Sequence, residues 1–266
     1  MTDWFQAVVL AFIQGLTEFL PISSSAHLLF PTLLLGWDDQ GVAFDVAVHF
    51  GTLLAVLWYF RADLWRLTGG VGGLLRGQVE SGESREILYL AIATVPAVVA
   101  GFLLNDAVDK LRSLPVIASS TIVFALVLAW ADRRGAISHR TEVPGMIAAL
   151  FIGLAQALAL IPGTSRSGIT LSAALFLGLS RQAAARFSFL LSIPVIAGAA
   201  LLKSLELLES RVSVDWGMLA LAAGLSGVVA YLTIAWFIAL VNRIGMMPFV
   251  LYRLVLGAAL VVVMYL

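Results

Sequence analysis

Long apolar stretches, interrupted by short polar segments, run along almost the whole chain. A helix of about 20 apolar residues crosses the hydrocarbon of a bilayer, which is about 30 Å thick. Six stretches approach that length and predict six transmembrane helices, over 44–60, 87–104, 114–131, 187–202, 217–241 and 249–266. The pattern therefore indicates an all-α polytopic membrane protein that forms a single membrane domain, 1–266.

Two further apolar stretches each end at a proline, and a loop rich in hydroxyl groups follows each proline. We call these loops the first loop, 21–25, and the second loop, 162–168. The apolar pieces after the loops are too short to cross a membrane. Irregular backbone persists at membrane depth only where protein or a wet cavity satisfies its polar groups. Both segments are therefore predicted to be re-entrant helical hairpins, 4–35 and 145–179.

The order of a hairpin followed by three spans occurs twice, over 1–131 and over 145–266. Because three is an odd number, the second copy of the unit enters the membrane from the opposite face. The sequence thus predicts an inverted repeat, an architecture found in many transporters. A proline with a serine three residues after it occurs in both loops. The alternative is accidental self-similarity, which any polytopic chain shows to some degree.

Composition agrees with a membrane protein and narrows its chemistry. The chain is 61% hydrophobic and only 12% charged, with a mean hydropathy of +1.01, whereas soluble domains are about 25% charged. Lys plus Arg and Asp plus Glu both count 16, so the zero net charge argues against a nucleic-acid partner. The absence of cysteine excludes disulfides, thiol catalysis and thiolate metal sites. Membrane lipids are the expected surroundings.

Basic residues in the segments between spans predict which face is cytoplasmic. Most of them fall in four segments, 61–86, 132–142, 180–186 and 242–248. Placing these segments inside puts both chain termini on the outer face. Segment 61–86 contains several glycines and is predicted to be mobile. Glycines within the spans permit close helix contacts within or between subunits, which leaves a homodimer open; they are Gly153, Gly198, Gly224 and Gly227.

Gln14 and Glu18 are four residues apart before the first loop, so on a helix they share one face. An ionised glutamate within a membrane segment is expensive and usually lines a cavity or pathway. Its carboxylate and the amide of Gln14 supply oxygen ligands suited to Mg²⁺ or Ca²⁺, so these two residues are the candidate metal ligands. The alternative is a glutamate that only caps or anchors the end of the segment. His49 and Asp45, by contrast, are expected to serve hydrogen bonds between helices.

The first loop continues into a serine-rich run with a histidine: Ser23, Ser24, Ser25 and His27. These residues supply a candidate nucleophile, donors for phosphate oxygens and a base that titrates near neutrality. In the alternative interpretation, the serines cap a helix over 26–35 and His27 lies at its start. That interpretation describes the same residues and does not exclude the chemical one.

The second loop surrounds a permanently charged guanidinium, that of Arg166, with hydroxyl groups and glycines. A guanidinium suits bidentate contact with phosphate, and a helix predicted to start at Ile169 adds oriented N–H groups. The loop is therefore a candidate phosphate-binding site; alternatively, Arg166 pairs with Glu18 only to close the hairpins. The substrate-binding candidates are Gly163, Thr164, Ser165, Ser167 and Gly168, together with Ser23 and Ser25.

The segments QGLTEFLPISSSAH and PGTSRSGIT, in this order and spacing, resemble the two signature segments of a bacterial family. This is the undecaprenyl pyrophosphate phosphatase family, the integral-membrane type also known as the bacitracin resistance protein family. The resemblance covers essentially the whole chain. It implies an enzyme of the bacterial cytoplasmic (inner) membrane that removes the terminal phosphate from a C55 polyprenyl diphosphate and recycles the lipid carrier for cell-wall synthesis. It also implies a divalent cation and a site that opens to the outer, periplasmic face.

The resemblance further implies roles for single residues. Ser165 and Thr170 match polar positions of the family's second motif, which adds Thr170 to the substrate-binding candidates. Gln14 stands where many members have glutamate, so the idea of two carboxylates on one metal loses support. The catalytic positions of the family motifs are matched by Glu18, Ser24, His27 and Arg166.

These residues suggest a diphosphate bound between the two loops, with its polyprenyl tail in lipid or in a groove between spans. Ser24, deprotonated by His27, would attack the terminal phosphorus; alternatively, Glu18 or His27 would activate a water, and the sequence does not choose between these routes. The rival prediction is a polyprenyl-phosphate transporter, which would carry the head group across the membrane without hydrolysis.

Overall fold

The computed structural model describes residues 4–38, 40–79, 81–111, 113–135, 137, 140–143, 145–209 and 215–265. These residues form eleven α-helices, one short 3-10 helix and no strand, apart from an isolated bridge between Arg140 and Leu179. The all-α class is therefore confirmed. In chain order the helices are α1 (Trp4–Thr17), α2 (Ser24–Leu35), α3 (Gly41–Tyr59), α4 (Arg61–Leu75), α5 (Gly82–Lys110), α6 (Leu114–Gly135), α7 (Met146–Ala157), η1 (Leu158–Leu160), α8 (Arg166–Phe176), α9 (Arg181–Glu209), α10 (Trp216–Ile244) and α11 (Met247–Val263).

Five helices in the described part of the chain are long and apolar enough to cross a membrane: α3, α5, α6, α9 and α10. They correspond to five of the six predicted spans. The remaining predicted span, 249–266, coincides with α11, which has 17 residues and ends at Val263. At 1.5 Å per residue, α11 is about 25 Å long, so it falls among the shorter apolar helices together with α1 and α7.

The prediction of a mobile segment over 61–86 is wrong, because α4 occupies much of it. The glycines of this segment serve helix packing instead of flexibility. A Cβ atom added to Gly70 would lie 2.6 Å from the backbone of Glu83, and one added to Gly73 would lie 2.5 Å from Ser84 Oγ. Ser84 Oγ also donates a hydrogen bond of 3.0 Å to Gly70 O. Small residues thus let α4 lie directly against the start of α5.

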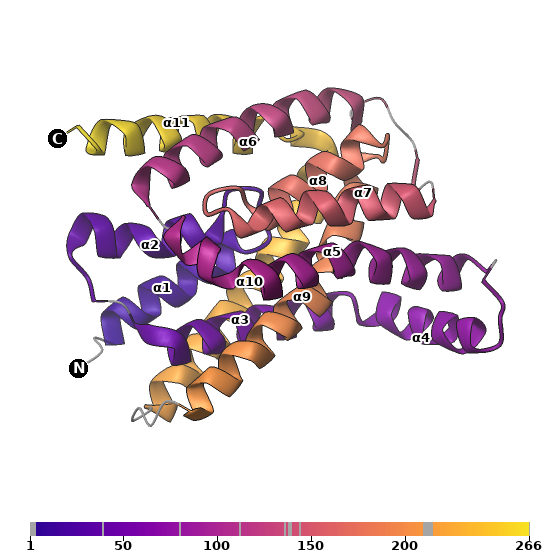
Figure 1. The fold of residues 1–266 in the computed structure, drawn as a ribbon, viewed down its shortest axis with the longest axis horizontal. Helices are drawn as coiled ribbons and strands as arrows, with labels where there is room; N and C mark the ends of the chain where they lie inside the picture. The colour runs from indigo at the N-terminus through magenta and orange to yellow at the C-terminus, as the bar shows by residue number, and fades with distance from the viewer. Residues whose placement is uncertain are drawn as a thin grey trace.

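The two hairpins start from opposite ends of the molecule (Figure 1). Both marked chain ends lie at the end where α1 begins, whereas α7 begins near the other end, where α4 lies. Two of the glycines within spans bring helices together inside the subunit. A Cβ atom added to Gly227 on α10 would lie 3.0 Å from Gly51 O on α3, and one added to Gly153 on α7 would lie 2.8 Å from Ala93 Cα on α5.

A row of aromatic rings packs against the first hairpin just after the end of α1. The buried ring of Phe19, next to Glu18 in the chain, lies 5.3 Å from the ring of Phe189 on α9. Phe237 of α10 continues the row at 5.6 Å from Phe189, and Phe249 of α11 follows at 5.3 Å. Such edge-to-face and tilted contacts favour a defined geometry. They fix the end of α1 against three helices of the second half of the chain.

Candidate active site

The first and second loops meet in the structure, although 148 positions of sequence separate their charged residues. Arg166 Nη2 donates a hydrogen bond of 2.9 Å to Glu18 Oε1. Both side chains are largely buried, with exposed fractions of 13% for Arg166 and 7% for Glu18. Ser167 Oγ donates a second link, of 2.8 Å, to Leu20 O. The loops therefore form one polar site between the hairpins.

The carboxylate of Glu18 is the centre of this site. Its Oε2 atom accepts hydrogen bonds from Ser24 Oγ, at 2.7 Å, and from Gln14 Nε2, at 3.0 Å. Gln14 and Glu18 therefore share one face, as their spacing predicts. His49 of α3 also reaches the site, with its Nε2 atom 4.0 Å from Glu18 Oε2. The expectation that His49 serves only helix contacts missed this proximity.

The structure does not pair Ser24 with His27, one of the routes that the sequence left open, because both side chains have other partners. Ser24 donates to Glu18, while the two ring nitrogens of His27 lie 2.7 Å from Ser23 O and 2.5 Å from the hydroxyl of Tyr252. The ring contacts the carbonyl four residues earlier because side chains in a helix lean toward its N-terminus. In this geometry the base next to Ser24 is Glu18.

The two loops have the same local geometry. Ser23 and Ser165 are the non-glycine residues with positive φ in the described chain, at 74° and 70°, and each directly precedes a helix. In each loop that serine's Oγ lies 3.2 Å from the Oγ two residues later, in Ser25 and Ser167 respectively. Such backbone costs about 1–3 kcal/mol per residue and clusters at functional sites.

This geometry aligns the two loops differently from the proline spacing. The two alignments differ by one residue. Ser23 corresponds to Ser165, because the second loop has one more residue between its proline and the helix cap. Ser24 therefore occupies the place that Arg166 has in the other loop. α8 accordingly starts at Arg166, three residues before its predicted start at Ile169. The same backbone presents a hydroxyl in one loop and a guanidinium in the other.

Arg253 of α11, which the sequence reasoning missed, holds both loops in place. Its side chain is fully buried. It donates to Pro21 O at 3.2 Å, to Gly163 O at 2.9 Å and to Thr164 O at 3.0 Å. Arg253 is the only charged residue of the apolar stretch 249–266. The principle that an intramembrane charge marks a functional place could have found it.

Several predicted substrate-binding residues use their polar groups within the protein. Ser165 Oγ accepts a bond from Gly168 N at 3.2 Å, and Thr170 Oγ1 donates to Arg166 O at 2.9 Å. The two glycines make room: a Cβ atom on Gly163 would lie 2.6 Å from Ile117 O, and one on Gly168 would lie 2.9 Å from Arg253 Nη1. These residues shape the second loop.

Three buried polar atoms at the site have no hydrogen-bond partner among the described residues. They are Arg166 Nη1, Thr164 Oγ1 and Gln14 Oε1. A buried polar group without a partner costs about 1–3 kcal/mol, and its persistence is typical of a site that completes itself with a ligand. A guanidinium and a hydroxyl suit phosphate oxygens, whereas a carbonyl oxygen suits a cation.

The described residues include no group of three or more His, Cys, Asp or Glu side chains that could hold a metal ion. Mg²⁺, however, is usually bound through one or two carboxylates together with substrate phosphates and water. Glu18 and the unpartnered Gln14 Oε1 fit the protein side of such a shell. The residues therefore fit a cation that shares its ligands with a phosphate-bearing substrate.

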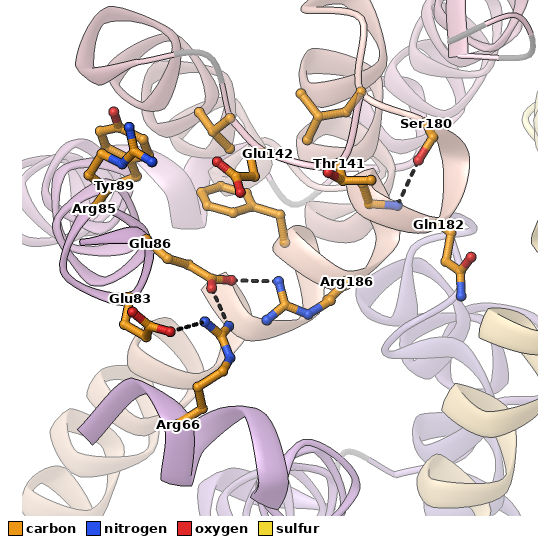
Figure 2. Close-up of a pocket in the computed structure, with 15 residues that line it drawn as sticks. Arg66, Glu83, Arg85, Glu86, Tyr89, Thr141, Glu142, Ser180, Gln182 and Arg186 are labelled. Atoms are coloured by element: carbon orange, nitrogen blue, oxygen red, sulfur yellow. Dashed lines mark hydrogen bonds and ion pairs between the residues drawn. The ribbon is translucent and has the colours of Figure 1, made fainter. Parts of the chain in front are cut away.

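A second cluster of charges lies apart from the site, around a cavity of about 470 Å³ (Figure 2). Arg186 of α9 donates to Asp63 Oδ1 of α4 at 2.5 Å and to Glu86 Oε1 of α5 at 2.5 Å. Arg66 of α4 also pairs with Glu86 and lies 3.7 Å from Glu83 Oε1. The cluster joins α4, α5 and α9. We call it the α4–α5–α9 cluster.

Fold and site together define the class of the protein. It is a multi-pass helical membrane protein with a polar site of one carboxylate, one hydroxyl and one guanidinium between two hairpin loops. The chain belongs to the family described as bacitracin resistance protein BacA, which matches residues 7–259. The family resemblance seen in the two motifs is thereby confirmed.

Two curated relatives cover nearly the whole chain. An undecaprenyl-diphosphatase of Alcanivorax borkumensis is 60% identical over 259 residues, which are 97% of this chain and 98% of the relative. An undecaprenyl-diphosphatase of Chromohalobacter salexigens is 54% identical over 261 residues, 98% of each chain.

Proposed function

We propose that this protein is an undecaprenyl-diphosphatase, a membrane hydrolase that converts undecaprenyl diphosphate to undecaprenyl phosphate and inorganic phosphate. Family membership and the names of the two relatives support the activity. The single structural observation that carries it is the carboxylate of Glu18, which binds the hydroxyl of Ser24 through Oε2 and the guanidinium of Arg166 through Oε1. This arrangement combines a nucleophile, a base and a phosphate ligand.

Arg166 and Thr164 bind the diphosphate in this proposal. Their unpartnered atoms Nη1 and Oγ1 lie in the same loop and are buried. Contact with the phosphates draws the guanidinium toward the substrate, and the carboxylate of Glu18 becomes a stronger acceptor as its bond to Arg166 weakens. Arg166 also offsets the negative charge that develops as the bridging oxygen leaves.

Ser24 acts as the nucleophile. Its hydroxyl gives its proton to Glu18, at the 2.7 Å hydrogen bond that already exists, and its oxygen forms a bond with the terminal phosphorus. The bond from that phosphorus to the bridging oxygen breaks, and undecaprenyl phosphate leaves with the electron pair. Water then attacks the phosphoserine, which releases inorganic phosphate and returns a proton to Ser24 Oγ.

A divalent cation, Mg²⁺ or Ca²⁺, completes the proposed site. Glu18 and Gln14 Oε1 are the residues that would hold it, as the unpartnered oxygen of Gln14 suggests. Bound there, the cation would neutralise phosphate charge and act as a Lewis acid. His27 contributes to the site through its place in the first turns of α2, close to Ser24.

The topology that accompanies this function is an inverted repeat of 1–131 and 145–266 with hairpins 4–35 and 145–179. The equal backbone of the two loops supports the repeat. α11 is the proposed sixth span, since it lies along α6, where a Cβ atom on Gly257 would come close to Ile122. The site opens to the outer, periplasmic face in this proposal, because the exposed Ser25 lies on the hairpin that starts from the end with both termini.

The direct test is phosphate release by the purified protein in detergent from a C55 or C15 prenyl diphosphate, with and without Mg²⁺ or Ca²⁺. We expect release that depends on the cation. Folded protein that binds the lipid without releasing phosphate under any cation condition would contradict the enzyme and favour the polyprenyl-phosphate transporter.

A further inference from the structure

The tautomer of the neutral His27 ring follows from its Nδ1 contact, because the partner of that nitrogen can only accept a hydrogen bond. Nδ1 lies 2.7 Å from Ser23 O, and a carbonyl oxygen only accepts, so Nδ1 carries the hydrogen and donates. Nε2 lies 2.5 Å from the hydroxyl of Tyr252. In the neutral ring with hydrogen on Nδ1, Nε2 is an acceptor, so the Tyr252 hydroxyl donates to it.

Tyr252 connects two parts of the molecule that otherwise meet through apolar contacts. Among the described residues, its bond to His27 is the only hydrogen bond between α2 and α11. Nearby, the buried Ala26 and the partly buried Leu29 of α2 share an apolar cluster with Leu260 of α11 and with Ile117 and Ala118 of α6. The ring planes of His27 and Tyr252 are nearly parallel, at 12°, with centroids 5.6 Å apart. One directional contact therefore sets how α2 is rotated against α11.

This rotation decides where Ser24 lies, because Ser24 is the first residue of α2 and His27 lies one turn later. Next to Tyr252, Arg253 holds the carbonyls of both loops. α11 thus fixes the loop backbone through Arg253 and the start of α2 through Tyr252. The hydroxyl of Ser24 must lie within hydrogen-bond reach of Glu18 for the transfer of its proton.

We propose that Tyr252 is a positioning residue of the phosphatase: its hydroxyl binds Nε2 of His27, fixes the start of α2 and thereby places Ser24 against Glu18. The proposal rests on the proposed function and adds a residue from α11 to it. Tyr252 acts through His27 and makes no contact with the reacting atoms. Its loss therefore lowers kcat and leaves KM for the prenyl diphosphate nearly unchanged.

The test uses full-length protein in detergent and the variant Tyr252→Phe, which keeps the ring and removes only the hydroxyl. We expect a fall in kcat of about tenfold, the usual cost of one positioning hydrogen bond, with KM within twofold of wild type. The matched control is Tyr231→Phe on α10, a tyrosine that packs against Tyr59 and lies outside the site. This control is expected to keep the kinetics of the wild type.

Nitrogen NMR of protein labelled with ¹⁵N-histidine gives a reading that does not depend on activity. The spectrum of His27→Gln identifies the resonances of His27. In wild type we expect Nδ1 to be protonated and Nε2 to show the resonance of a hydrogen-bonded acceptor. In Tyr252→Phe we expect Nδ1 to keep its hydrogen, which Ser23 O still accepts, and the Nε2 resonance to shift because its hydrogen bond is lost. An unchanged His27 spectrum in folded Tyr252→Phe overturns the proposal, as does a wild-type kcat. If the wild type releases no phosphate, the proposed function fails, and the spectra still decide whether Tyr252 binds Nε2 of His27.

A double-mutant cycle separates action through His27 from an independent effect. If Tyr252 acts through His27, Tyr252→Phe in the His27→Gln background changes kcat by less than twofold. A full tenfold loss in that background contradicts the proposal, because the two residues would then act independently. Thermal unfolding gives the folded fraction of each protein in the cycle. Each kcat is expressed per folded molecule, so a variant that folds poorly can still be compared.

Discussion

The two charged clusters of this protein use their hydrogen-bonding capacity differently. In the α4–α5–α9 cluster, each of the three guanidinium nitrogens of Arg186 donates to a carboxylate, of either Asp63 or Glu86. In the candidate active site, Arg166 also pairs with a carboxylate, but its Nη1 atom is buried without a described partner. A satisfied cluster holds helices together, whereas an unsatisfied one leaves groups for a ligand. Unused hydrogen-bonding capacity, more than charge itself, distinguishes the candidate active site from the structural cluster.

The largest expected effect comes from breaking the pair at the active site. Glu18→Gln removes the proton acceptor, and Arg166→Ala removes the phosphate ligand, so we expect phosphate release to fall at least about 1,000-fold in each. Release measured at saturating Mg²⁺ checks this expectation, with gel filtration in detergent to confirm that the variants fold. Activity within tenfold of wild type in either variant would falsify the proposed roles.

Ser24→Ala is the next largest change. It removes the nucleophile but keeps Glu18 and Arg166, and a water can take the place of the hydroxyl, so we expect a loss of about 100-fold. The measurement is the rate of phosphate release, together with a search for ³²P bound to the protein after acid quench. Ser119→Ala is the matched control, because in the described part of the chain that exposed serine of α6 bonds only within its own helix. An unchanged rate in Ser24→Ala supports direct attack by water.

Gln14 tests whether an unpartnered buried atom of the active site, its Oε1, marks a place for a ligand. Gln14→Ala removes the amide oxygen beside Glu18, and we expect the Mg²⁺ concentration for half-maximal rate to rise several-fold. Gln14→Glu adds a second carboxylate, which hard cations prefer, so we expect that concentration to fall. Titrations of activity with Mg²⁺ check both variants. The same Mg²⁺ dependence in all three proteins argues that Gln14 does not contact the cation.

The smallest effect on activity is expected in the α4–α5–α9 cluster. Arg186→Ala breaks bonds between α9 and two other helices, so we expect the free energy of unfolding to fall by about 1–2 kcal/mol, as for a partly exposed pair. Phosphate release per folded molecule stays within twofold of wild type. Thermal unfolding in detergent and the release assay measure the two quantities. A loss of activity in Arg186→Ala as large as that in Arg166→Ala would contradict a purely structural role for the α4–α5–α9 cluster.

Sequence spacing predicted one part of the candidate site correctly and another part incorrectly. The face shared by Gln14 and Glu18 follows from helical spacing, and the structure shows it directly. The match between the loops was off by one residue, because the spacing from a proline does not reveal where the chain turns to positive φ. Within one segment, sequence spacing is a good guide as long as the backbone conformation is regular.

Packing also gives the glycines of segment 61–86 a different role from the one that the sequence suggests. Glycines suggested flexibility in 61–86, yet Gly70 and Gly73 lie against the start of α5. The same residue type permits motion in a free segment and close contact in a packed one. Which of the two applies depends on neighbours that the local sequence does not name.

Local sequence patterns alone indicate a helical membrane protein with two polar loops, and with a carboxylate, hydroxyls and a guanidinium in or beside them. These features depend on the spacing of apolar and polar residues over a few turns, which the chain carries locally. The packed fold was needed to show that Ser24 bonds to Glu18, that His27 bonds to Tyr252, and that Arg253 holds both loops. Those partners lie up to 232 positions apart, and the packing of α11 along α6, with Arg253 reaching both loops, brings them together where no local pattern could.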